Sequence, residues 1–330
     1  MKKISFVHDI FPHLVALAPF LLITVFFFNP VFFVNRTLEQ PDIQQYLGTS
    51  KAISDYREQT GEEPLWTNSV FSGMPAYLIS VQWGNQAIVI MKKILSVGLP
   101  HPIGNIFLAF VCYYIMLLAF GVRPWLAIAG AVAFGLSSYL IVGLSAGHNS
   151  RIGAIAFVPL VVAGIHLCFS GRRVLGFSLV AAALALHLRE NHLQITYYLM
   201  LIVGIYGIAT LVEFIREKKY TDFLKNIALL LLAAVLAAGT FFGQFWAITE
   251  YTKYSTRGKF ELTKPGEGTP ESGLTREYAF QYKYGILEPM TLLIPELYGG
   301  GSGKFFYQDR NSESYKSLVG SNNPEMANQL

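Results

Sequence analysis

The sequence is poor in charge and in cysteine. Only 14% of its 330 residues are Asp, Glu, Lys or Arg, while 53% are hydrophobic, a balance too apolar for a soluble domain of this length. Cys112 and Cys168 both lie inside apolar runs, which indicates neither a disulfide framework nor a thiolate metal site. The composition therefore predicts an integral membrane protein.

The chain also lacks a concentrated basic surface. Its net charge is only +4, and many Lys and Arg residues sit in short segments beside apolar runs, where orientation in the bilayer explains them. A nucleic-acid partner is therefore not indicated.

Seven apolar runs are present, and a membrane-spanning helix needs about 17 to 25 such residues. They cover residues 11–33, 103–120, 125–144, 152–169, 174–188, 195–212 and 227–248. Basic residues alternate with these runs at 2–3, 123, 172–173, 216–219 and 225. If all seven runs span, every basic cluster falls on one side, which the positive-inside rule makes cytoplasmic. We therefore expect an all-α polytopic protein with about seven transmembrane helices and a cytoplasmic N-terminus.

This topology predicts a transmembrane domain over residues 1–253 and an extracytoplasmic tail over 254–330. A large first extracytoplasmic loop covers residues 34–102. In that loop we expect a short helix at 54–59 and an interfacial helix at 86–99, since the second stretch is too interrupted by Lys92 and Lys93 to cross. The helix at 86–99 could guide a lipid into a site or simply anchor the protein.

A carboxylate lies a few residues after the first run. Asp42 comes after Pro41 and meets both water and lipid headgroups, so it could act as a general base toward a substrate hydroxyl. An ordinary capping role in the loop is the simpler interpretation of this residue alone.

Two external turns add polar groups on the same side. His148 and Arg151 lie between the third and fourth runs, and Arg189, Glu190 and His192 lie between the fifth and sixth. Arg and His here could bind a phosphate, since the guanidinium presents a planar fork of donors. Alternatively, Arg151 anchors the interface, and Arg189 pairs with Glu190 at the rim.

Imidazole and carboxylate groups also suit a divalent cation such as Zn or Mn. The set would be Asp42, His148, Glu190 and His192, although no ligand spacing supports it. After the seventh run, Tyr254 and Arg257 belong to a basic and aromatic segment that suits an anionic headgroup or a sugar.

In these stretches the sequence resembles the YfhO family of bacterial membrane proteins, within the GT-C class of glycosyltransferases. The similar stretches are DIQQY at 42–46, PLWTN at 64–68, FSGMP at 71–75, GH at 147–148, YSTRG at 254–258 and LLIPELYGG at 292–300. They follow the family's order over almost the whole chain.

The resemblance implies a GT-C-like fold in the bacterial cytoplasmic membrane, with the active face outside. It implies an enzyme that moves a sugar from a polyprenyl-phosphate donor to an extracytoplasmic acceptor, a lipid, polymer or protein. The family's acidic residue in the first external loop corresponds to Asp42. Members are usually longer, so we expect the tail to continue into a longer protein.

Other classes of function remain open at this stage. A polytopic transporter or lipid flippase would place ionisable residues near the midplane, whereas the centres of these runs are nearly free of charge. A membrane acyltransferase could use His148 or His192 as its base, which leaves Asp42 unexplained.

Overall fold

The computed structural model describes residues 11–84, 86–255, 276–281, 283–294, 297 and 313–320. The chain divides into two compact units, Met1–Thr275 and Arg276–Leu330. In the second unit the described elements are a helical turn α12 (Arg276–Ala279), the 3-10 helix η3 (Glu288–Leu292) and helix α13 (Glu313–Gly320).

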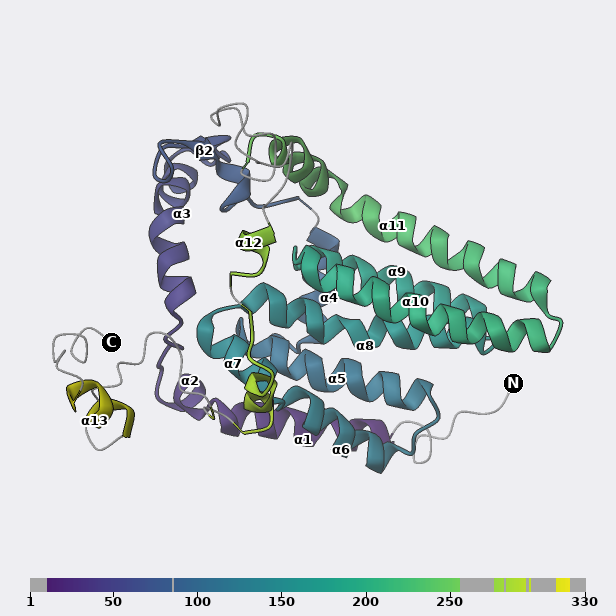
Figure 1. Ribbon diagram of the computed structural model, residues 1–330. Helices are drawn as coiled ribbons and strands as arrows, with labels where there is room; N and C mark the ends of the chain where they lie inside the picture. The colour runs from purple at the N-terminus through teal and green to yellow at the C-terminus, as the bar shows by residue number, and fades with distance from the viewer. Residues whose placement is uncertain are drawn as a thin grey trace. The chain divides into compact units, whose positions relative to one another are not determined.

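Each of the seven apolar runs forms helix in the first unit (Figure 1). The helices are α1 (Phe11–Phe27) with α2 (Asn29–Phe33), α5 (Ile103–Ala119), α6 (Pro124–Gly135) with α7 (Ser138–Ala146), α8 (Asn149–Phe169), α9 (Arg173–Arg189), α10 (Leu193–Arg216) and α11 (Tyr220–Thr252). Among the described residues, four helical segments are long and apolar enough to cross a membrane: Pro124–Ala146, Asn149–Phe169, Leu193–Arg216 and Tyr220–Thr252. The fold is thus almost entirely α-helical and supports an integral membrane protein. The count of seven spans stays a prediction, since α1, α5 and α9 each have only 17 residues.

Helix α8 forms the centre of the bundle and packs against α5 on one side and α9 on the other (Figure 1). Small residues allow the closest approach. A Cβ added to Gly176 of α9 would lie 2.5 Å from the backbone nitrogen of Cys168 and 2.6 Å from the carbonyl oxygen of Gly164, both on α8. Close backbone contact of this kind is how helices associate in a membrane.

The large loop after α2 contains more helix than expected. Helix α3 runs over Pro41–Thr60, whereas the sequence predicted helix only at 54–59. Pro41 occupies the first helical turn and Gly61 ends the helix in the left-handed conformation, with φ of 73°, which are the usual start and stop residues of a helix. A short hairpin of β1 (Trp66–Thr67) and β2 (Met74–Pro75) follows, then η2 (Ala76–Leu78) and α4 (Gln86–Leu95).

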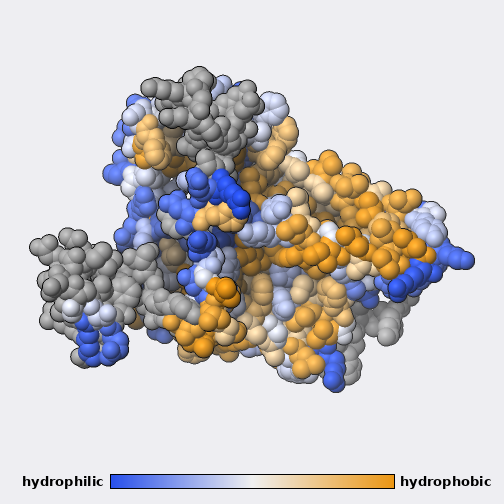
Figure 2. Space-filling model, viewed as in Figure 1, coloured by the Kyte–Doolittle hydropathy of each residue, from blue (hydrophilic) through white to orange (hydrophobic). Residues whose placement is uncertain are grey.

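The surface of α10 and α11 is strongly apolar. Figure 2 shows hydrophobic residues along both helices and hydrophilic residues at the turn that joins them. Ile205 and Val235 are 72% and 67% exposed. A continuous apolar surface of this kind is rare on proteins surrounded by water, and it suits contact with lipid.

Candidate functional site

The start of α3 lies against the turn between α7 and α8. Asp42 is in the first turn of α3, which corrects its expected place in a loop. Gly147 has a φ of 98°, and a Cβ added there would lie 3.1 Å from the Cβ of Asp42. Only glycine combines this backbone conformation with so close an approach, so the sequence Gly147-His148 positions the carboxylate.

Asp42 forms an ion pair with His148, the residue that precedes α8. The Nε2 atom of His148 lies 2.9 Å from Oδ2 of Asp42. Both side chains are partly open to solvent, with the histidine 41% and the aspartate 53% exposed. Two groups that the sequence placed 106 positions apart therefore share one site with access for a substrate.

A buried amide network holds this arrangement. Gln40 donates from Nε2 to the Leu144 carbonyl and to Oδ1 of Asn149 at 3.0 Å, and Nδ2 of Asn149 donates back to Oε1 of Gln40 at 3.1 Å. Asn105 on α5 donates to the backbone carbonyl of Asn149 at 3.0 Å. Buried amides must be paired to offset their desolvation, so this network fixes the residue before α3 to the start of α8. This pairing could not be predicted from the sequence, although Gln40 lies near Asp42 and Asn149 follows His148.

Three nitrogen atoms in and around the Asp42–His148 pair are buried without a hydrogen-bond partner among the described residues. They are Nδ1 of His148, Nε of Arg151 and Nδ1 of His192. The guanidinium of Arg151 lies over the ring of Tyr139, 5.1 Å from its centroid. Burial lowers the pKa of His192, and the positive charge of Arg151 and then that of His148 lower it further. The three groups therefore share one electropositive neighbourhood.

In the turn after α9, Arg189 and Glu190 contact other groups and not each other. Arg189 donates from both terminal nitrogens to the Trp83 carbonyl at 3.3 Å, and Glu190 accepts from Nζ of Lys92 at 2.7 Å. Arg189 and Glu190 thus have separate partners and form no rim pair, and Arg189 does not join the three unpaired nitrogens. The Glu190 side chain is only 7% exposed, and a Cβ on Gly153 of α8 would lie 2.2 Å from its Oε2. This packing raises the pKa of Glu190 by burial, which Lys92 partly offsets.

The Lys92–Glu190 pair also assigns a role to α4. The helix lies where the sequence predicted an interfacial helix, with Ile90 and Ile94 exposed. Lys92 points inward to the α9–α10 turn, and Lys93 is exposed. This charge pair therefore joins α4 to the helix bundle.

The remaining predicted site residues are Tyr254 and Arg257. Tyr254 is 70% exposed, and its ring contacts are with Lys253 at 5.0 Å and with Tyr251. Arg257 lies outside the described residues. No group of three or more His, Cys, Asp or Glu side chains within the described part of the chain is arranged to hold a metal ion. Asp42, His148, Glu190 and His192 thus form no common ligand set, because Glu190 is turned to Lys92.

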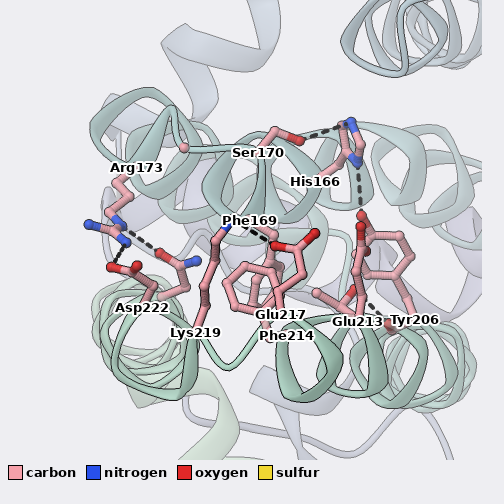
Figure 3. A pocket seen from close by; sticks show the side chains of 13 residues that line it. His166, Phe169, Ser170, Arg173, Tyr206, Glu213, Phe214, Glu217, Lys219 and Asp222 are labelled. Atoms are coloured by element: carbon pink, nitrogen blue, oxygen red, sulfur yellow. Dashed lines mark hydrogen bonds and ion pairs between the residues drawn. The ribbon is translucent and has the colours of Figure 1, made fainter.

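A polar pocket of about 470 Å³ lies at the opposite ends of helices α8, α9, α10 and α11. Figure 3 shows several of its polar side chains paired with one another. Arg173 bonds to Asp222 at 2.6 Å and to Asn226 at 2.7 Å, Lys219 pairs with Glu217 at 2.7 Å, and His166 bonds to Tyr206 at 2.8 Å. These contacts connect α8 to α10 and α9 to α11, so the pocket is accounted for by helix packing.

We call residues 40–42, 147–151 and 189–192 the Asp42 end, and residues 166–173 and 213–226 the Arg173 end. The chain matches no protein-family model, no curated protein and no solved structure. Any function therefore has to be argued from the Asp42 end itself.

Proposed function

We propose that the chain is a membrane glycosyltransferase of GT-C type that moves a sugar from a polyprenyl-phosphate carrier to an extracytoplasmic acceptor. One observation carries the proposal. A solvent-accessible carboxylate, Asp42, is paired with His148, whose buried Nδ1 lacks a hydrogen-bond partner among the described residues, as do Nε of Arg151 and Nδ1 of His192. A carboxylate that can accept a proton and an anion-binding cluster in one place suit the attack of a hydroxyl on a sugar phosphate.

The groups divide the reaction between them. Asp42 takes the proton of the acceptor hydroxyl, whose oxygen forms a bond to the anomeric carbon as the bond from that carbon to the phosphate oxygen breaks. The phosphate leaves with the bonding electrons, and its charge is balanced by Arg151 and by N–H groups of His148 and His192. As an imidazolium, His148 donates from Nε2 to Asp42 and keeps its Nδ1–H for the phosphate. Such electrostatic stabilisation of the leaving group supplies a large part of catalysis.

The same geometry favours a second candidate. A carboxylate that holds Nε2 of His148 leaves Nδ1 free to act as a base, so the pair also suits a membrane acyltransferase. Arg151, whose buried Nε has no hydrogen-bond partner among the described residues, favours the phosphate donor instead, because only that reaction develops negative charge on a departing phosphate.

The test is transfer by the purified protein with a polyprenyl-phosphate sugar, compared with a lipid acyl donor. We expect Asp42→Asn to reduce sugar transfer by a factor of about 100 or more, the usual contribution of a general base. Asp55→Asn is the matched control, since Asp55 lies on the same helix and only pairs with exposed Lys51. Full sugar transfer by Asp42→Asn, or transfer of acyl groups alone, would reject the proposal.

A further inference from the structure

A long apolar groove lies among α8, α9, α10 and α11. It encloses about 550 Å³, and its walls are formed almost wholly by aliphatic side chains and small residues. Gly204 on α10 lines it together with Ala234 and Ala238 of α11, and a Cβ at Gly204 would meet no atom within 4 Å. The groove is therefore open space beside α10, where larger side chains would otherwise fill the bundle.

The groove begins at the Asp42 end. Leu188 and Thr196 line its wall there, and Thr196 lies one helical turn after His192. The Thr196 hydroxyl is hydrogen-bonded to Nε2 of buried His187 at 3.0 Å. An apolar channel and the cluster of unpaired nitrogens are thus separated by about one turn of α10.

From Thr196 the groove follows α10 inward to Gly204. Eight residues of helix at 1.5 Å each give a length of about 12 Å. Val161 and Ile165 of α8 and Ile227 of α11 line its inner part, so a chain lying in it would run toward the Arg173 end.

We propose that this groove holds the first part of the hydrocarbon chain of the lipid-phosphate donor while its phosphate contacts His148, Arg151 and His192. The inference rests on the donor class of the proposed function. An amphiphile with an anionic head and a long chain matches both features together, because the guanidinium and the buried imidazole nitrogens suit an anion and the adjoining channel is lined by apolar groups. The bound chain would also orient the anomeric carbon toward Asp42.

The groove is tested by filling it. In Gly204→Phe the new ring occupies the channel, so we expect the affinity of the purified protein for a long-chain polyprenyl phosphate to fall about tenfold or more. Its affinity for inorganic phosphate, which has no chain, should stay unchanged. Ala234→Phe fills the groove from α11 and should give the same result if Gly204→Phe is poorly folded.

Gly207→Phe is the matched control. Gly207 is on the same helix, its Cβ position is also open, and it does not line the groove, so both affinities should be retained. Unchanged polyprenyl-phosphate affinity in both groove variants would overturn the inference, as would an equal loss for phosphatidic acid, which would indicate a general lipid groove. If the wild-type protein binds polyprenyl phosphate no better than polyprenol, the proposed function fails instead.

Discussion

The two ends of the helix bundle treat polar groups in opposite ways. At the Arg173 end, Arg173, Lys219 and His166 each have a protein partner within 2.8 Å. At the Asp42 end, buried nitrogens of Arg151 and His192 have none among the described residues. A buried polar group without a partner carries a desolvation cost, and such a cost is retained where a ligand offsets it.

The comparison separates structural charge from charge available for binding. Lys92 and Glu190 show that the Asp42 end also contains structural charge, since their pair joins α4 to the α9–α10 turn. Proximity to the site is therefore a poor guide to function. A better guide is whether a group already has a partner within the protein, and the following substitutions test this criterion.

The largest effect is expected from Lys92→Met. It leaves the buried Glu190 carboxylate without its partner, which costs about 3–5 kcal/mol in comparable buried pairs. Denaturant unfolding of the purified protein in detergent would measure the change. Lys93→Met should have almost no effect, because Lys93 is exposed. The double variant Lys92→Met/Glu190→Gln should recover most of the loss, and a double variant as unstable as the single one would contradict the assignment.

The same pair makes a prediction about pH. Burial raises the pKa of Glu190 above its ordinary value of 4.5. The folded protein then holds this proton to a higher pH than the unfolded chain does, so stability is present below pH 4.5 and is lost as pH rises through the raised pKa. Removing Lys92 strengthens the effect. The deficit of Lys92→Met should therefore shrink on acidification, and a deficit that grows would refute the cause.

A smaller effect is expected at Arg151, where substitution should change binding more than stability. Charge-assisted hydrogen bonds contribute about 1.5–3 kcal/mol, so Arg151→Gln should weaken polyprenyl-phosphate binding about 10- to 100-fold. Its stability should fall by only about 1 kcal/mol, because the substitution removes the contact with the Tyr139 ring while Nε of Arg151 has no hydrogen bond to lose. Arg172→Gln, at an exposed position on the Arg173 end, should bind as the wild type does. A variant that loses stability and keeps its affinity would make Arg151 a structural residue.

Much of the fold could be predicted because lipid requires long apolar helices. The seven runs became helices, although the third run is broken between α6 and α7 and α11 begins at Tyr220 and not at 227, whereas α3 was missed over most of its length. Its sequence is polar and carries almost no helical periodicity, so only Pro41 and Gly61 marked its ends. Apolar length predicts helices in a bilayer well, and it says little about helices that lie outside one.

The candidate site was predictable in part. The shared side of Asp42 and His148 followed from the predicted topology, in which the turns after the first, third and fifth runs lie on one side. The partners did not follow, since Gln40 meets Asn149 and Lys92 meets Glu190 only after segments about 100 residues apart fold onto each other. Side-chain direction at such turns depends on backbone details like the positive φ of Gly147. Sequence therefore indicated where polar groups gather and left open which of them are already paired.

The smallest effect is expected at the Arg173 end, where it completes the comparison. The Arg173–Asp222 pair is partly exposed, at 35% and 46%, and pairs of this kind contribute at most about 1 kcal/mol. Arg173→Gln should lower the unfolding free energy by no more than that and leave polyprenyl-phosphate affinity unchanged. Asp222→Asn should give a similar value, and the double variant should show a small coupling. If Arg173→Gln weakened donor binding as much as Arg151→Gln, pairing within the protein would not mark a structural residue, and the unpaired nitrogens of the Asp42 end would lose their meaning as a binding signal.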